Sequence, residues 1–175
     1  GFRKNIKVPK NYVAIQARYL SKKNKNLKNY DVKKNINMMN LKKLIEKILK
    51  KKKNINIMII STETPNFFKN KIGIKDKKIF FSQTFAKNFL DTGLLILKAK
   101  LFLAHNSSGI GFFAIFSKVP FIMTWPYYTL QNEFKWSKSQ SKLTSWQNRY
   151  QKTYFKVTFK EYEAKILKFL DVHEI

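Results

Sequence analysis

The chain has 175 residues, of which 44% are apolar, enough to bury the core of one domain and too many for a disordered polycation. No apolar run reaches the roughly 18 residues of a membrane span, and without cysteine the chain forms neither a disulfide nor a thiolate-bound metal site. The formal net charge of +26 comes almost entirely from lysine, because only Arg3, Arg18 and Arg149 are arginine. Such a charge attracts polyanions, so RNA, nucleotide phosphates and an anionic membrane surface are all candidate partners.

The first part of the chain predicts a strand, a helix and a second strand. Residues 1–10 are expected to be a lead-in, and residues 11–18 (NYVAIQAR) are rich in strand-forming side chains. After a polar loop, residues 36–51 place apolar side chains at helical spacing with lysines between them, which predicts an amphipathic helix. Residues 55–61 (INIMIIS) are nearly continuously apolar, as is typical of a parallel strand buried on both faces.

The middle of the chain repeats this alternation. Residues 65–74 are expected to form a short helical or irregular connection, and residues 78–83 (KIFFSQ) a third strand. A helix is predicted over residues 85–98. Its expected apolar face consists of Phe85, Phe89, Leu90, Leu94, Leu95 and Leu97.

The stretch from residue 101 to residue 124 predicts a strand, a tight polar turn, a short helix and another strand. The apolar run 101–104 is followed by the turn 105–109 (HNSSG), a helix over 110–118 and a strand over 120–124. A turn that leads into a helix presents free backbone N–H groups, which bind anions. We therefore expect a ligand to be held by Asn106, Ser107, Ser108, Gly109 and Ile110.

Five apolar strands that alternate with helices predict a doubly wound, mainly parallel α/β sheet of Rossmann-like type, with the order 3-2-1-4-5 and helices on both faces. In this order strands 1 and 4 are neighbours at the switch point, so Arg18 and the turn 105–109 meet at one sheet edge. Arg18 either contacts a phosphate or carboxylate there or anchors the next loop. Thr62, which follows strand 2, and Gln83, the last residue of strand 3, are expected at the same edge.

The last part of the chain is rich in aromatic residues. Residues 125–154 are expected to be a long aromatic loop, and loops of this length in a compact domain are usually functional. A terminal helix is predicted over residues 160–170. Residues 11–175 would then form a single Rossmann-like domain.

Three segments resemble the C-terminal, donor-binding half of GT-B-type glycosyltransferases, in particular the bacterial enzymes of surface-polysaccharide synthesis. They are residues 12–18 (YVAIQAR), 101–122 (LFLAHNSSGIGFFAIFSKVPFI) and 144–166 (TSWQNRYQKTYFKVTFKEYEAKI). The resemblance implies a nucleotide-sugar donor as substrate, a glycan or lipid-linked acceptor, and an N-terminal acceptor domain that is missing from this chain. It also implies a cytoplasmic enzyme, with the inner face of the membrane as a candidate location.

The residues suggest how such an enzyme would work. Ser107, Ser108 and the N–H groups of Gly109 and Ile110 would cradle the diphosphate, with Arg18 adding positive charge. His105 would contact the sugar or act as a catalytic base, because imidazole titrates near neutral pH; the alternative is a loop histidine without a role. The sequence has no Asp-x-Asp motif, so we expect a metal-independent enzyme without a further cofactor.

Two other functions fit the composition. The lysines and the aromatic residues of 125–154 would suit a non-catalytic RNA- or polyanion-binding protein, such as a ribosome-associated one. Against this, the basic residues are spread along the whole chain. A transferase half that keeps the fold and has no activity is the third alternative. Acidic residues that would hold a ribose or sugar are few, and Glu63, Asp91 and Glu133 have no clear place in the motif.

Overall fold

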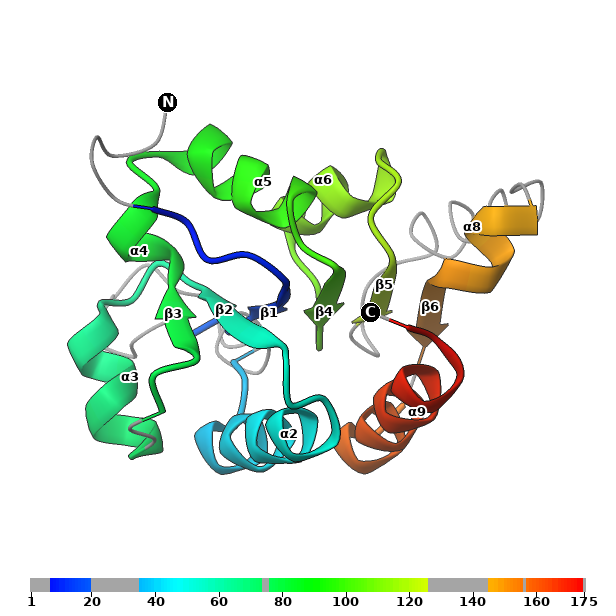
Figure 1. Cartoon of the computed structure of the whole chain (residues 1–175), viewed down its shortest axis with the longest axis horizontal. Coiled ribbons are helices and arrows are strands. Elements are labelled where there is room, and N and C mark those ends of the chain that lie inside the picture. Colours follow the sequence, from blue (N-terminus) through cyan, green and yellow to red (C-terminus); the bar gives the residue numbers. More distant parts are fainter. Residues whose placement is uncertain (1–6, 20–34, 74–75, 126–144, 156, 175) are drawn as a thin grey trace.

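The computed structural model describes residues 7–19, 35–73, 76–125, 145–155 and 157–174. Within them a sheet of six parallel strands lies between two layers of helices (Figure 1). The spatial order is β3-β2-β1-β4-β5-β6, so the predicted order is confirmed and extended by one strand. The strands are β1 (Tyr12–Gln16), β2 (Asn56–Ile60), β3 (Ile79–Phe81), β4 (Leu101–Ala104), β5 (Phe121–Trp125) and β6 (Gln151–Phe155).

Helices cover both faces of this sheet, as predicted. Side chains from α2 (Met38–Lys51), α3 (Pro65–Ile72) and α9 (Phe159–Val172) join one core cluster. Side chains from α4 (Ser82–Phe85), α5 (Phe89–Leu97) and α6 (Phe112–Ile115) join the other. A single 3₁₀ turn, η1 (Gly109–Gly111), leads into α6, and α8 (Ser145–Tyr150) precedes β6.

Alternation along the strands divides the core into these two clusters. In β1, Val13 and Ile15 face the α2 side, whereas Tyr12 and Ala14 face the α5 side. All five residues of β1 are buried, because β1 lies between β2 and β4 in the middle of the sheet. This two-sided burial explains why the central strands are almost continuously apolar.

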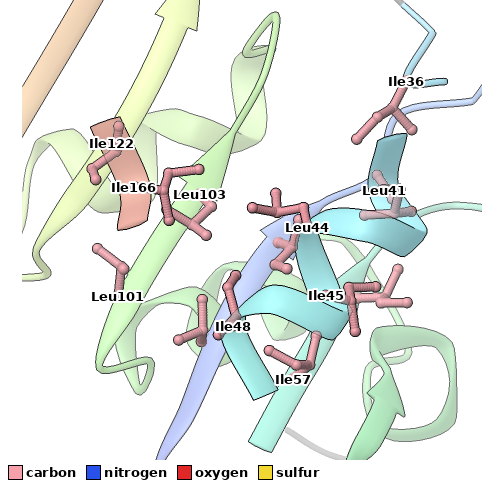
Figure 2. Close-up of a cluster of buried hydrophobic side chains, with 14 of the residues drawn as sticks. Ile36, Leu41, Leu44, Ile45, Ile48, Ile57, Leu101, Leu103, Ile122 and Ile166 are labelled. Carbon is pink, nitrogen blue, oxygen red and sulfur yellow. The ribbon is translucent and has the colours of Figure 1, made fainter. Parts of the chain in front are cut away.

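Figure 2 shows how α2 packs on the sheet. Leu41, Leu44, Ile45 and Ile48 recur at intervals of three and four residues and are all fully buried. They meet apolar side chains from the strands, among them Ile57 and the labelled residues of β4 and β5. The predicted amphipathic helix is therefore confirmed, and its lysines lie on the opposite side.

The helix predicted over residues 85–98 is wrong in two respects. It is broken into α4 and α5, because the Asn88 side chain caps a new helix by accepting a hydrogen bond from the Asp91 N–H at 2.9 Å. Most of its expected apolar face also lies in solvent: Phe89, Leu90, Leu94 and Leu97 are 40–66% exposed. Of the expected face only Phe85 and Leu95 are buried, together with Ile96, which was not expected there. The Tyr12 hydroxyl donates to the Leu95 carbonyl and holds α5 in place.

The predicted aromatic loop of residues 125–154 is also wrong in part. Its end forms α8 and then the sixth strand, β6, which pairs with β5 from Phe121 to Trp125. The apolar signal of a strand is weak here because β6 is an edge strand and begins with the polar residue Gln151. Gln151 is buried because its amide donates to the carbonyls of Ser117 and Val119, at 2.9 and 3.2 Å. Residues 126–144 of this loop, most of the polar loop before α2, and lead-in residues 1–6 lie outside the described residues.

Candidate functional site

A pocket of about 490 Å³ opens at the carboxyl edge of the sheet, where β1, β2 and β3 end. This volume lies within the range of small-ligand sites. The position is also the one at which open parallel sheets bind ligands, since β1 and β4 diverge into connections on opposite faces here. The pocket is lined by Gln16, Arg18, Tyr19, Ile60, Ser61, Thr62, Gln83, Ala86, Lys87, Asn88, Phe89, Thr92, Ser108, Gly109 and Ile110.

Gln16, the last residue of β1, has a side-chain amide that is only half satisfied. Gln16 is 5% exposed, and its Nε2 donates to the Ser108 hydroxyl. Its Oε1 is buried and has no hydrogen-bond partner within the described structure. An unmet buried polar group costs about 1–3 kcal/mol, so a ligand that donates a hydrogen bond to Oε1 would remove this penalty.

The turn after β4 is fixed by its hydrogen bonds to β5. Asn106 adopts a left-handed conformation with φ of 56°, which asparagine tolerates better than most residues. The N–H of Asn106 donates to the Thr124 hydroxyl and that of Ser107 to the Thr124 carbonyl, both at 2.9 Å. The turn therefore holds Ser107 inside, 2% exposed, and directs Ser108 to the pocket.

Close packing beneath the turn leaves no room for a side chain at residue 111. A Cβ on Gly111 would overlap the Ser107 hydroxyl and approach the Met123 sulfur to 3.2 Å. A Cβ on Gly109 would meet nothing within 4 Å. The two glycines of the turn thus differ: Gly111 is required by packing, and Gly109 is open to the pocket side.

The connections after β2 and β3 form the opposite wall of the pocket. The Ser61 carbonyl accepts hydrogen bonds from Gln83 Nε2 at 2.9 Å and from the Ser82 hydroxyl at 3.2 Å. Thr62 follows and is exposed. These bonds tie the two loops together, so Thr62 and Gln83 lie at one edge as expected.

The charge of the pocket is positive. Arg18 and Lys87 line it, and none of the described lining residues is acidic. Asp91 lies close by at the start of α5, but it is buried, and the Lys87 backbone N–H donates to its carboxylate at 3.0 Å. That hydrogen bond lowers the pKa of Asp91. Tyr19 and Phe89 add two aromatic rings to the pocket wall, so the site offers cations, polar groups and flat apolar surfaces.

His105 is turned to the α9 side of the sheet and does not line the pocket. Its ring lies 5.2 Å from those of Phe159 and Tyr162, and its Nδ1 is 3.0 Å from the Thr124 hydroxyl. Burial lowers the pKa of His105 to about 4, so the ring is neutral at pH 7. In this position His105 packs between the turn and α9, on the side away from the pocket.

The structure brings together six of the nine residues predicted for the site: Arg18, Thr62, Gln83, Ser108, Gly109 and Ile110. Asn106, Ser107 and His105 belong to the same turn and are not part of the pocket lining. Sequence reasoning missed Gln16, although a lone polar residue inside the apolar run YVAIQA is a readable signal. It also missed Lys87 and Phe89, because the apolar pattern does not show the break between α4 and α5.

Comparison with solved structures shows the same fold in larger proteins. The chain matches the structure of S. aureus MnaA with UDP at a TM-score of 0.57 and 15% identity, over 98% of this chain and 41% of that one. It matches a Listeria monocytogenes protein assigned as a UDP-N-acetylglucosamine 2-epimerase at a TM-score of 0.56 and 12% identity, over 97% and 40%. A scan against protein-family models and a search of the curated proteins return no match.

These likenesses support the fold, a Rossmann-like α/β domain. The chain spans about two fifths of the length of the two solved proteins.

Among the described residues, no helix has the length and apolar character needed to cross a membrane. Nor do three or more histidine, aspartate or glutamate side chains gather in that part of the chain as ligands for a metal ion.

Proposed function

We propose that this chain is the nucleotide-sugar-binding domain of a larger GT-B-like enzyme. The observation that carries the proposal is the pocket at the switch point, which combines two cations with the half-satisfied amide of Gln16. A nucleoside diphosphate offers phosphate oxygens for the cations and a base or ribose for the amide. The fold likeness to a protein solved with UDP supports this choice of ligand.

Each part of the pocket has a matching role. Arg18 and Lys87 would bind the two phosphates, with the Ser108 hydroxyl as a further donor. Tyr19 or Phe89 would stack on the base, because aromatic rings bind the flat faces of bases. Gln16 would complete its hydrogen bonding to the bound nucleotide, which would remove the penalty of its unmet amide.

For the reaction we propose transfer of the sugar to a glycan or lipid-linked acceptor, with the acceptor site on a second domain outside this chain. Stabilising the departing diphosphate is the catalytic contribution that this pocket would make, because negative charge develops on it as the sugar leaves. The assignment of His105 as a base or sugar contact stays a prediction. If the chain is an inactive transferase half, it should bind the nucleotide without transferring the sugar.

Binding of nucleotides to the purified chain tests the proposal. Isothermal titration with UDP, GDP, ADP and CMP, and with their sugar conjugates, should identify one preferred nucleotide. Arg18→Ala and Gln16→Leu should each weaken its binding by about tenfold or more, since hydrogen bonds to charged or buried groups are worth about 1.5–3 kcal/mol. Lys100→Ala is the matched control, because Lys100 precedes β4 at the opposite edge of the sheet.

Two results would overturn the proposal. One is the absence of binding to every nucleotide and nucleotide-sugar. The other is equal affinity in Arg18→Ala, Gln16→Leu and Lys100→Ala, which would place the nucleotide elsewhere. Binding to RNA with a steep loss of affinity in salt, and no binding to nucleotides, would favour the polyanion-binding alternative.

A further inference from the structure

Two neighbouring helices present apolar side chains to solvent. On α5, Leu90, Leu94 and Leu97 recur at intervals of four and three residues and are 66%, 40% and 40% exposed. On α6 and just after it, Phe112 and Phe116 are 47% and 76% exposed, with their rings stacked at 5.9 Å. With Phe89, which is 59% exposed, these residues form what we call the α5–α6 face.

The α5–α6 face is continuous because the two helices are in close contact. Phe113 of α6 packs against Phe89, with ring centroids 5.4 Å apart. The same ring lies against Gly93, where a Cβ would overlap it. Both helices lie on the same side of the sheet, at the top of Figure 1. Groups of exposed apolar residues of this kind mark interaction sites.

The charge around this face is positive. Residues 82–120, from α4 to the start of β5, contain four lysines and a single acidic residue, Asp91, which is buried. Lys98, Lys100 and Lys118 are exposed where α5 and α6 lead into β4 and β5, and Lys87 is exposed at the start of α5. The other side of the sheet carries charges of both signs: α2 and α9 contain eight lysines together with Glu46, Glu161, Glu163 and Asp171, two of which pair with lysines of α2.

We propose that the α5–α6 face docks on an anionic membrane surface. Exposed leucine and phenylalanine side chains inserted at the headgroup level, with lysines around them, are the features by which amphipathic segments bind anionic lipids. The lysines beside the α5–α6 face support this choice of occupant, because the one acidic residue of that region, Asp91, is buried and none faces the lipid. A second copy of the chain is a poor occupant, since it would bring the same lysines together.

The proposed membrane contact is independent of the nucleotide proposal, although one residue links them. Phe89 belongs to the α5–α6 face and also lines the pocket. A membrane on this face would therefore lie beside the mouth of the pocket. That placement suits a substrate carried on a lipid.

Vesicle sedimentation tests the contact. Vesicles of phosphatidylcholine with about one third phosphatidylglycerol should bind the chain, and pure phosphatidylcholine should bind it weakly. Leu94→Ser with Phe116→Ser should reduce binding about tenfold or more. Met39→Ser with Val172→Ser is the control, because these residues of α2 and α9 are 60% and 69% exposed on the other side.

The contribution of the lysines around the α5–α6 face is tested in the same way. Lys98→Glu with Lys118→Glu should also reduce binding to the anionic vesicles about tenfold. Lys43→Glu with Lys50→Glu reverses two exposed lysines of α2 and should change it little. Equal loss in both pairs would show attraction by total charge alone and would overturn the proposal.

The absence of cysteine gives a direct readout of orientation. A polarity-sensitive dye on Phe116→Cys should shift its emission to the blue when anionic vesicles are added, whereas the same dye on Met39→Cys should not. A blue shift at both positions or at neither would overturn the proposal. So would a dimer in light scattering, without lipid, that Phe116→Ser dissociates.

Discussion

The neutral state of His105 predicts that part of the stability of the fold is lost in mild acid. The ring is held between Phe159, Tyr162 and Thr124, and burial lowers its pKa to about 4, from 6.5 in an unfolded chain. As the pH falls, the unfolded state therefore takes up the proton first. The contribution is complete above about pH 6.5 and is lost progressively as the pH falls towards 4.

The size of the effect follows from the two pKa values. A pKa difference of about 2.5 corresponds to about 3 kcal/mol, because each pKa unit is worth about 1.36 kcal/mol. His105 is half-buried, and water reaching the ring would screen part of this, so we expect a loss of about 2 kcal/mol between pH 7 and pH 4.5. His105→Gln removes the titrating group and should make stability less dependent on pH in this range.

The assay is urea unfolding at several pH values between 4.5 and 7.5. The comparison is best made in chains that also carry His173→Gln, because His105 is then the only histidine. Between pH 4.5 and pH 7, the unfolding free energy of the chain that keeps His105 should rise by about 2 kcal/mol relative to that of the chain with His105→Gln. If the difference in unfolding free energy between the two chains stays constant with pH, the ring is not buried in its neutral form. A pKa of His105 near 6.5, measured by NMR titration, would refute the prediction in the same way.

Two further substitutions test the packing around the turn. Tyr162→Phe should lower the free energy of unfolding by about 1–2 kcal/mol in urea denaturation, because the buried hydroxyl donates to the Ile122 carbonyl at 3.0 Å; an unchanged value would mean that the carbonyl finds another donor. Gly111→Ala should cost about 1–3 kcal/mol, since its Cβ would overlap Ser107, and it should also weaken nucleotide binding, whereas Gly109→Ala should leave stability nearly unchanged. Similar stability of the two alanine variants would contradict the close packing at residue 111.

The strand order could be predicted from the sequence because the central strands carry an unusually clear signal. Parallel strands buried on both faces must be apolar along their whole length, and the segments that form β1, β2 and β4 nearly are. The edge strand β6 lacks this signal. Its first residue, Gln151, is buried through hydrogen bonds to two carbonyls, and that is a property of the tertiary contact.

The prediction of one helix over residues 85–98 was wrong for a different reason. Its apolar residues were assigned to the core because an apolar stripe at helical spacing usually packs inward. The start of α5 is instead set by the Asn88 cap, and the helix buries Leu95 and Ile96 while Leu90 and Leu94 stay in solvent. When a helix is apolar on nearly all sides, its sequence does not predict which side packs against the sheet.

The site was predicted in outline because topology alone brings the ends of β1 and β4 together. What topology could not give is which side of the sheet each polar residue faces. His105 and Ser108 lie three residues apart in one turn, yet the first packs on α9 and the second lines the pocket. The left-handed Asn106 between them makes this reversal.

Because of this reversal, one part of the turn packs against β5 and α9, and the other part lines the pocket. Thr124 holds the backbone of Asn106 and Ser107 from β5, and its hydroxyl also meets the ring of His105. Ser108 is then placed to meet Gln16, the one polar side chain of β1 apart from the Tyr12 hydroxyl. A ligand that satisfied the second half of the Gln16 amide would thus be held by the centre of the sheet. Arg18 and Lys87, which would bind the phosphates, line the same pocket. Because all of these groups belong to this chain, a nucleotide should bind to it even without a second domain.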